Sequence, residues 1–319
     1  MQEGICWKLI VGFTVVLLIG YGRAGAATPP SGQIFIVEEC NHRLVRISDM
    51  TGAGWTTFGS FGTGLNQFAW PQGIFVGLTG QIYVADTGGG WHDYFGKSRI
   101  VRINNMTGAG WTTFGTRGNG VNQFNEPRGI FVNAAGQIYV ADSGNHRIVR
   151  INDMTGAGWT TFGSYGTGIN QFQIPRSIAV TPAGQIYVAD SFNHRIVRID
   201  DLKGTGWTTI GTIGAGINQF SQITDMFVSP AGQIYVADFY RGIVRFNDMT
   251  GAGWTTLEAF TGGGLGSIFA NASGQIFAGE YNRISRINDM TGAGAITFSP
   301  GIEKGTLKDQ FSGPHIFAR

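Results

Sequence analysis

The chain has 319 residues, with 22 Lys plus Arg against 20 Asp plus Glu, for a formal net charge of +2 at pH 7. A balance this close to neutral excludes the strongly basic field on which non-specific nucleic-acid or anionic-membrane binding depends. Apolar residues make up 42% of the chain, which is enough for a sizeable core. The 52 glycines recur at fixed places in a repeated pattern, so they indicate turns rather than low complexity.

Residues 1–26 are predicted to be a signal peptide. Lys8 precedes an apolar run from Leu9 to Gly20, and Ala24-Gly25-Ala26 supplies a small-x-small cleavage site. The run has 12 residues, whereas a transmembrane helix needs about 20, so we expect cleavage after Ala26 rather than a retained anchor. The protein is then secreted or periplasmic, and its mature domain spans residues 27–319 with a net charge of +1.

The cysteines are too few for a cysteine-based metal site. Cys6 falls within the predicted signal peptide and leaves Cys40 alone in the mature chain. Cys40 stands where sister repeats have Gly144 and Phe192, which is a variable position, so we expect an unpaired thiol there.

One pattern recurs six times along the mature chain. At residues 136–163 it reads GQIYVADSGNHRIVRINDMTGAGWTTFG. The copies begin at glycines spaced 48, 56, 48, 48 and 42 residues apart, namely Gly32, Gly80, Gly136, Gly184, Gly232 and Gly274. A period in this range is typical of a repeat architecture.

Within one copy, residues 127–174, four short β-rich segments follow one another. They are residues 130–132, 137–142, 146–152 and 159–162, separated by turns rich in Gly, Asn and Asp, and a long connection then leads to the next copy. Four short strands per unit of about 48 residues predict a propeller blade. Six such units predict one all-β domain, a six-bladed β-propeller of four-stranded blades.

The ends of the repeat array predict how the ring closes. The first copy begins at Gly32 without an innermost strand of its own. Residues 314–318 (Pro-His-Ile-Phe-Ala) resemble the innermost strand of the second copy at residues 71–75, and Asp309-Gln310-Phe311 resembles Asn66-Gln67-Phe68. We therefore expect a C-terminal strand to complete the first blade, which removes the free edges of an open array.

The repeats resemble the NHL repeat family. The resemblance rests on Asn-His-Arg followed by Leu or Ile at residues 41–44, 145–148 and 193–196, and on Phe-x-x-Pro lead-ins such as residues 172–175. The fifth and sixth copies depart from this pattern at Tyr240-Arg241-Gly242 and Tyr281-Asn282-Arg283. The resemblance implies a propeller that binds proteins or RNA, although one related lineage, the peptide-amidating lyases, is catalytic and uses histidine-bound zinc.

Positions shared by the copies are assigned to the scaffold. The Trp that opens each fourth strand is expected to pack between blades, and the Asp that ends a second strand should hydrogen-bond the Arg that starts the third. His42, His146 and His194 lie on equivalent loops of a six-fold ring, too far apart for a zinc ion with ligands at about 2.0–2.1 Å, so we expect no metal and no cofactor. The other shared residues are Trp55, Trp111, Trp159, Trp207, Trp254, Asp86, Asp142, Asp190, Arg99, Arg147 and Arg195.

Positions that differ among the copies are the candidate binding residues. The second copy carries an insertion whose Gly88–Lys97 stretch displays aromatic and polar side chains on a glycine-hinged loop. The starts of the innermost strands also vary, and the topology places them around the channel mouth on the same face. The candidate partner-binding residues are Trp70, Gln72, Trp91, His92, Asp93, Tyr94, Phe95, Arg128, Arg176, Asp225, Tyr240 and His315.

Two main functions fit these residues. We predict a monomeric binding scaffold for a protein, peptide or glycan, with no nucleic-acid partner and no membrane insertion after signal cleavage. The alternative is a channel-mouth enzyme, a metal-dependent lyase or lactonase-type hydrolase, for which Glu126, Asp225 and His315 would supply the converging groups. These three form no recognisable motif, so we assign no catalytic residues and favour binding. A purely structural role in a surface or matrix also agrees with the near-identity of the blades.

Overall fold

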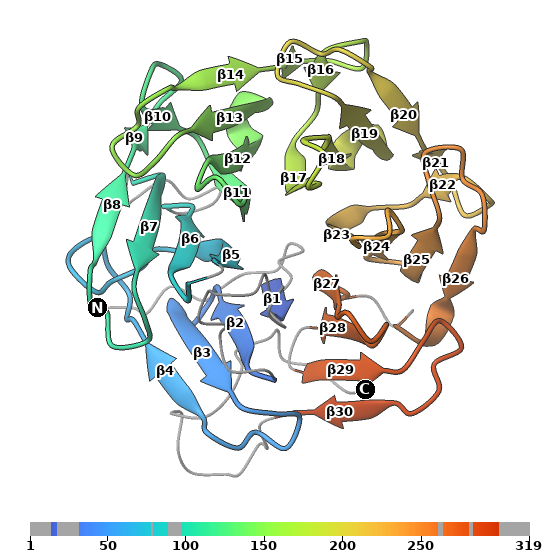
Figure 1. Ribbon diagram of the computed structural model, residues 1–319, viewed down its shortest axis with the longest axis horizontal. Helices are drawn as coiled ribbons and strands as arrows, with labels where there is room; N and C mark the ends of the chain where they lie inside the picture. The colour runs from blue at the N-terminus through green and yellow to red at the C-terminus, as the bar shows by residue number, and fades with distance from the viewer. Residues whose placement is uncertain are drawn as a thin grey trace, which may run out of the picture.

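The computed structural model describes residues 14–17, 32–77, 79–88, 97–260, 264–280 and 283–299. In this part of the chain the strands form six four-stranded antiparallel sheets, which stand around a common axis as propeller blades (Figure 1). Each blade runs from an innermost first strand to an outermost fourth strand. The predicted six-bladed all-β propeller is therefore confirmed.

The strands of the blades are short and regular. From the innermost strand outward, the first blade has β1 (Thr14–Leu17), β2 (Ile34–Glu38), β3 (Arg43–Ile47) and β4 (Thr56–Phe58), and the second has β5 (Pro71–Val76), β6 (Ile82–Asp86), β7 (Arg99–Ile103) and β8 (Thr112–Phe114). The third has β11 (Pro127–Val132), β12 (Ile138–Asp142), β13 (Arg147–Ile151) and β14 (Thr160–Phe162), and the fourth has β17 (Pro175–Val180), β18 (Ile186–Asp190), β19 (Arg195–Ile199) and β20 (Thr208–Ile210). The fifth has β23 (Ile223–Val228), β24 (Ile234–Asp238), β25 (Gly242–Phe246) and β26 (Thr255–Leu257), and the sixth has β27 (Ser267–Ala270), β28 (Ile276–Glu280), β29 (Arg283–Ile287) and β30 (Ile296–Phe298).

The connections between blades hold further short elements. Parallel two-stranded pairs form from β9 (Thr116–Arg117) with β10 (Gln123–Phe124), β15 (Ser164–Tyr165) with β16 (Gln171–Phe172), and β21 (Thr212–Ile213) with β22 (Gln219–Phe220). Single 3-10 turns are η1 (Ser143–Asn145), η2 (Ser191–Asn193) and η3 (Glu258–Phe260). Among the described residues, no helix has the length and apolar character needed to span a membrane.

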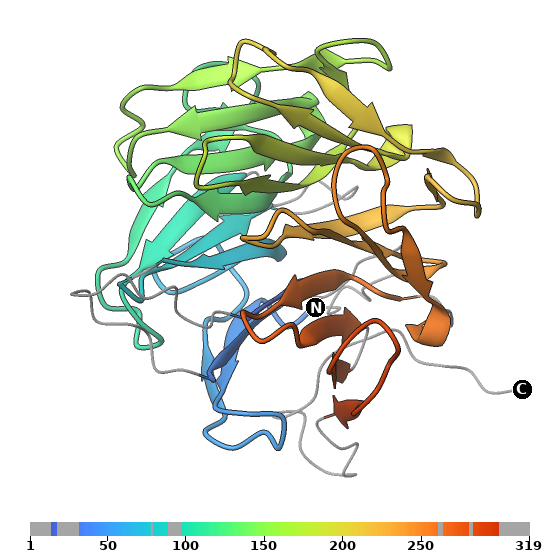
Figure 2. The same cartoon turned by 45° about the vertical axis from the view of Figure 1, so that its right-hand side comes forward.

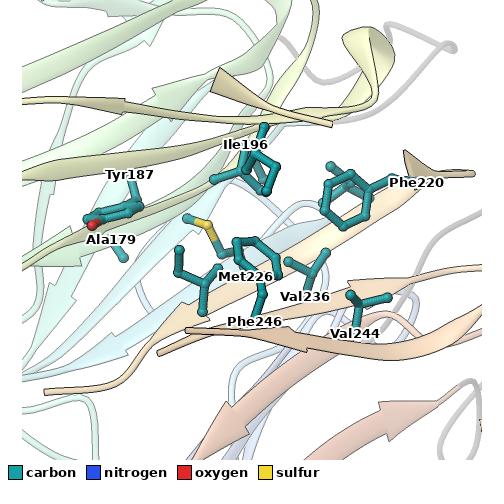
Figure 3. Packing of buried hydrophobic residues seen from close by; sticks show 12 residues of the cluster. Ala179, Tyr187, Ile196, Phe220, Met226, Val236, Val244 and Phe246 are labelled. Atoms are coloured by element: carbon teal, nitrogen blue, oxygen red, sulfur yellow. The ribbon is translucent and has the colours of Figure 1, made fainter. Parts of the chain in front are cut away.

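The hydrophobic core lies between adjacent blades, which pack face to face (Figure 2). A phenylalanine from each of four connections is fully buried there, namely Phe68, Phe124, Phe172 and Phe220. Figure 3 shows Phe220 with Ile196 of the fourth blade and Met226 and Phe246 of the fifth. Trp159 packs its ring 5.3 Å from that of Phe124 and 6.1 Å from that of Phe114 in the preceding blade. The predicted packing of the shared tryptophans between blades is confirmed.

The first blade differs from the prediction in its innermost strand. Strand β1 pairs antiparallel with β2, with Thr14 opposite Val37 and Leu17 opposite Ile34, and it contacts β5 on one side and β27 on the other. Residues 14–17 lie within the predicted signal peptide, and the predicted closing strand at residues 314–318 lies outside the described residues. Thr-Val-Val-Leu is rich in β-branched residues, which favour strands, although the segment also belongs to the apolar run of the predicted leader.

The expectation of an unpaired thiol at Cys40 is wrong. Cys40 is disulfide-bonded, and the other cysteine of the chain is Cys6, which lies outside the described residues. Removal of residues 1–26 would leave Cys40 as the single cysteine of the chain, which is why an unpaired thiol was expected. Cleavage after Ala26 therefore stays a prediction.

Candidate binding site on one face of the propeller

Strand register brings three kinds of segment to the same end of each blade. In the third blade Pro127 lies opposite Asp142, Asp142 lies opposite Arg147, and Ile148 lies opposite Phe162. The start of the first strand, the turn between the second and third strands, and the exit from the fourth strand are therefore at one end. We call this end of the propeller the connection face.

Shared polar residues fasten the connections to this face. Arg147 Nε donates to Asp142 Oδ2 at 2.8 Å, and the same guanidinium donates to the carbonyl oxygens of Asn119 and Gln123 at 2.8 and 2.9 Å. The pairs of Asp86 with Arg99 and of Asp190 with Arg195 repeat the 2.8 Å contact. The predicted Asp–Arg hydrogen bonds are confirmed, and they hold the connections that display the variable side chains.

His42 and His146 also serve the scaffold. Their backbones are left-handed, with φ of 53° and 56°. The Nδ1 atom of His42 accepts the backbone N–H of Trp70 at 3.1 Å, and that of His146 accepts the N–H of Ile174 at the same distance. Burial lowers the pKa of both imidazoles, that of His42 to about 4. No group of three His, Cys, Asp or Glu residues is placed to hold a metal ion in the described ranges.

A row of aliphatic side chains is exposed on the connections, and the sequence analysis missed it. Leu65, Val121, Ile169 and Ile217 occupy the equivalent position in four connections, and they are 71, 70, 72 and 74% exposed. Each precedes an Asn-Gln-Phe segment whose phenylalanine is buried. The repeated apolar residue was visible in the sequence, but only the structure shows that it faces solvent while the nearby Phe faces the core. We call these four residues the aliphatic row.

The starts of three innermost strands meet around the axis. A Cβ atom on Gly73 would lie 1.9 Å from the carbonyl oxygen of Arg128, and a Cβ on Gly129 would lie 2.7 Å from that of Arg176. Only glycine permits approaches this close. Because Gly73 and Gly129 have no side chains, the three strands pack closely at the channel mouth. Gln72, Arg128 and Arg176 lie at or next to these contacts, on neighbouring strands.

Two glutamates complete this cluster. Gln72 Nε2 donates to Glu39 Oε1 at 2.9 Å, and Arg128 Nη2 pairs with Glu126 Oε2 at 3.2 Å. Arg176 forms no hydrogen bond or ion pair with the described residues, and its guanidinium lies 5.8 Å from the ring centre of Phe192. We call Glu39, Gln72, Glu126, Arg128 and Arg176 the mouth cluster.

Burial controls the charges of the mouth cluster. Glu39 is 5% exposed, and burial raises its pKa to about 7. The hydrogen bond from Gln72 and the charges of Arg128 and Arg176 lower this pKa, but by less than burial raises it. Burial lowers the pKa of Arg176 to about 9, and the neighbouring Arg128 charge is the second cause of this decrease. The cluster therefore gains positive charge when the pH falls through about 7, because Glu39 is neutralised while Arg176 stays protonated.

Glu39 was missed although the repeats contain a signal for it. Glu39 stands where Thr87, Ser143 and Ser191 stand in the next three blades. Thr87 Oγ1 donates to the Pro127 carbonyl at 2.9 Å, and Ser143 Oγ donates to that of Pro175. A carboxyl in place of these small hydroxyls is a departure from the pattern of the kind that the sequence analysis used to find the other candidates.

The remaining candidates are not all near the mouth cluster. Trp70 lies beside His42 and Phe61, with ring centres 4.6 and 5.6 Å away. Asp225 accepts the N–H groups of Met226 and Ile268 at 2.8 and 3.0 Å, so it ties the fifth blade to the sixth, and burial raises its pKa to about 6. Tyr240 is 55% exposed, on the turn between the second and third strands of the fifth blade. Trp91, His92, Asp93, Tyr94, Phe95 and His315 lie outside the described residues.

Comparison with known proteins identifies the repeat. Residues 124–151 and 172–199 match the NHL repeat. NHL repeat-containing protein 3 of Mus musculus is 36% identical over 91 residues, and that of Homo sapiens is 35% identical over the same length. These residues make up 28% of this chain and 24% of each relative, so the match spans about a quarter of those proteins.

Solved structures share the fold at low sequence identity. A catalytically inactive form of virginiamycin B lyase from Staphylococcus aureus with quinupristin has a TM-score of 0.59 at 15% identity, covering 91% of this chain and 90% of that chain. A chain of a nidogen/laminin complex has a TM-score of 0.63 at 16% identity, covering 84% of this chain and 93% of that chain. The sheets and these likenesses define the class of protein as a six-bladed β-propeller. The matched segments show that the chain carries NHL repeats, and the relatives of similar sequence are NHL repeat-containing proteins.

Proposed function

We propose that this propeller is an exported, monomeric binding module that holds a protein, peptide or glycan on its connection face. The single observation that carries the proposal is the aliphatic row, whose four side chains are 70 to 74% exposed. Folding gains nothing from exposing aliphatic groups at four equivalent positions, whereas covering them with a partner removes apolar surface from water. An apolar surface of this kind favours a protein or peptide over a glycan.

Two further features support binding on this face. The mouth cluster adds charged groups inside the arc of the aliphatic row, and a mixture of apolar and polar groups suits specific recognition. Both ends of the Gly88–Lys97 insertion also lie on the connection face, where Gly88 N–H donates to the Ala69 carbonyl at 2.8 Å and Ser98 Oγ donates to the Thr87 carbonyl at 2.9 Å. One similar structure is a chain of a nidogen/laminin complex, that is, a propeller-like fold in a protein assembly.

The test compares matched triple variants in capture experiments. Val121→Ser, Ile169→Ser and Ile217→Ser remove three of the four side chains of the aliphatic row without touching the core, whereas Ala109→Ser, Ala157→Ser and Ala252→Ser place three serines at exposed turns on the opposite end. Chemical crosslinking of the wild type in an extract of its native source, followed by mass spectrometry, should map a partner onto the connection face. The first variant should capture at least about tenfold less of this partner, as expected when a few side chains supply most of the binding energy. The control variant should capture as much as the wild type. Equal capture by all three proteins would refute the proposal.

A channel-mouth enzyme remains the second candidate, and Glu39 is the observation that favours it. A buried carboxyl with a pKa raised to about 7 is suited to general acid–base chemistry at neutral pH. One similar structure is a virginiamycin B lyase, although fold alone does not define activity. Elemental analysis of the purified protein, together with Glu39→Gln in a lyase and lactonase substrate screen, separates the two functions. A turnover that disappears in Glu39→Gln would favour the enzyme.

We also propose that, once residues 1–26 are removed, the C-terminal segment takes the place of β1 beside β2. In the second to fifth blades the Asp that ends the second strand accepts a backbone N–H from two residues before the first strand; the donors are Ala69, Asn125, Gln173 and Ser221, at 2.6 to 2.7 Å. Glu38 replaces this Asp in the first blade, and its buried Oε1 has no hydrogen-bond partner among the described residues. The matching donor in the sequence is the N–H of Ser312, two residues before Pro314.

A further inference from the structure

We propose that Arg128 and Arg176 form an oxyanion-binding site at the channel mouth, which takes a carboxylate or phosphate group of the bound partner. The inference rests on the proposed binding function, because it names the chemical group that this face recognises. It assigns a ligand to side chains that the scaffold does not use.

The two guanidinium groups have few hydrogen-bond acceptors around them. Each guanidinium carries about five N–H donors and accepts nothing. The described residues give Arg128 one side-chain acceptor, Glu126 at 3.2 Å, and give Arg176 none. The Nε atoms of both arginines are buried without a partner among the described residues, as are those of five third-strand arginines. A charged group partly removed from water without hydrogen bonds is costly, so an oxygen ligand would stabilise the pair of guanidinium groups at the mouth.

The two charges are held in fixed positions. The close approach at Gly129 holds the strands that carry Arg128 and Arg176 against each other, and the one at Gly73 holds the Gln72 strand against that of Arg128. The guanidinium of Arg176 is further placed by Phe192, whose ring is 5.8 Å away. Two like charges held near one another repel, and an anion between them removes that repulsion. The planar fork of a guanidinium matches the two oxygens of a carboxylate or phosphate.

Glu39 competes with an external anion for the two arginines. Glu39 faces Gln72, Arg128, Arg176 and Glu126, and it acts as an internal counterion when it is ionised. Its Oε2 atom is buried without a partner among the described residues, and Gln72 binds the other oxygen. Protonation of Glu39 therefore frees the arginines for a ligand, and an external anion should bind more tightly as the pH falls. With a Glu39 pKa of about 7, the protonated fraction changes about tenfold between pH 8 and pH 6, which sets the expected change in affinity.

The experiment titrates the full chain with sodium acetate and, separately, with inorganic phosphate at constant ionic strength. The readout is the NMR signals of the arginine Nε–H groups. In the wild type the Arg176 and Arg128 signals should shift and saturate, and acetate should bind up to about tenfold more tightly at pH 6 than at pH 8. Acetate stays ionised across this window, so its pH dependence reports on the protein. A lower dissociation constant for acetate assigns the group to a carboxylate, and a lower one for phosphate assigns it to a phosphate.

Three variants make the test specific. Arg176→Gln should weaken binding at least about tenfold, and Glu39→Gln should give at pH 8 the affinity that the wild type has at pH 6. The matched control is Arg198→Gln in the same blade, where Arg198 pairs with Asp200 at 2.8 Å, and it should bind like the wild type. The proposal is overturned if no signal saturates or if Arg176→Gln binds as the wild type does. The proposed binding function is tested separately, because it fails if the aliphatic-row variant captures as much partner as the wild type. That outcome would not change the result of the anion titration.

Discussion

At the residue scale, the repeated polar residues act through left-handed corners and buried ion pairs. His42 and His146 turn the chain at positive φ and accept a backbone N–H from the connection to the next blade. The Asp and Arg of each repeat join this corner to the connection from the preceding blade, since Arg147 donates to Asp142 and to the carbonyl oxygen of Gln123. In the third blade Asn-His-Arg therefore fastens the blade to both neighbouring connections, because Asn145 and Arg147 donate to the preceding connection and His146 accepts from the following one.

The imidazole of His42 should make stability depend on pH. Burial lowers its pKa from about 6.5 to about 4, so the folded protein favours the neutral form. The stabilisation is complete above pH 6.5 and is lost as the pH falls through about 4. We expect the wild type to lose about 2 kcal/mol more of its unfolding free energy between pH 7 and pH 4.5 than His42→Asn, after allowance for partial exposure.

Asn is a suitable replacement because it tolerates a left-handed backbone and keeps a side-chain acceptor. Urea unfolding at a series of pH values measures the difference between the two proteins. Parallel pH profiles would show that His42 does not titrate in this range.

At the element scale, each connection between blades has one side chain that enters the core and another that faces solvent. Phe172 is fully buried between the third and fourth blades, whereas Ile169, three residues earlier, is 72% exposed. The parallel pair of β15 and β16 holds this segment so that the two side chains point in different directions. A connection that would otherwise only link two blades thereby contributes both to the core and to the proposed binding surface.

Phe172→Ala should be strongly destabilising. Removing a fully buried phenylalanine from a packed core costs about 3–5 kcal/mol, since the transferred area is lost and a cavity is left. The matched control is Ile169→Ala on the same connection, which should change stability by less than about 0.5 kcal/mol. Denaturant midpoints at equal slope give both values. Similar losses in the two variants would contradict the packing described here.

At the scale of the whole molecule, ring closure decides which segments belong to the domain. The innermost strands contact one another around the axis, and β1 fills the place between β27 and β5. Signal cleavage would remove β1, so the mature ring needs another strand beside β2. The unpartnered Oε1 of Glu38 and the match between residues 309–318 and 66–75 identify the C-terminal segment as its proposed replacement.

Truncation and a single proline test this closure. In a protein of residues 27–319, deleting residues 309–319 should lower the unfolding midpoint and broaden the transition, because a sheet edge and an adjacent blade face become exposed. Ser312→Pro removes the backbone N–H proposed to reach Glu38 and should cost about 1–3 kcal/mol. Ser312→Ala keeps that N–H and should behave like the parent. Identical unfolding of the parent, the truncation and Ser312→Pro would refute C-terminal closure.

The blades were predictable from the sequence, because each depends on contacts within about 48 residues of chain. Strand patterns, glycine turns and the Asp–Arg pairs all act locally, so their repetition made them visible. The mouth cluster was not predictable in this way, since Glu39, Gln72, Arg128 and Arg176 come from four different blades and the pKa of Glu39 depends on burial that no local pattern encodes. The same holds for the place of β1 in the first blade and for the exposure of the aliphatic row, because both depend on which neighbour is present to cover an apolar segment.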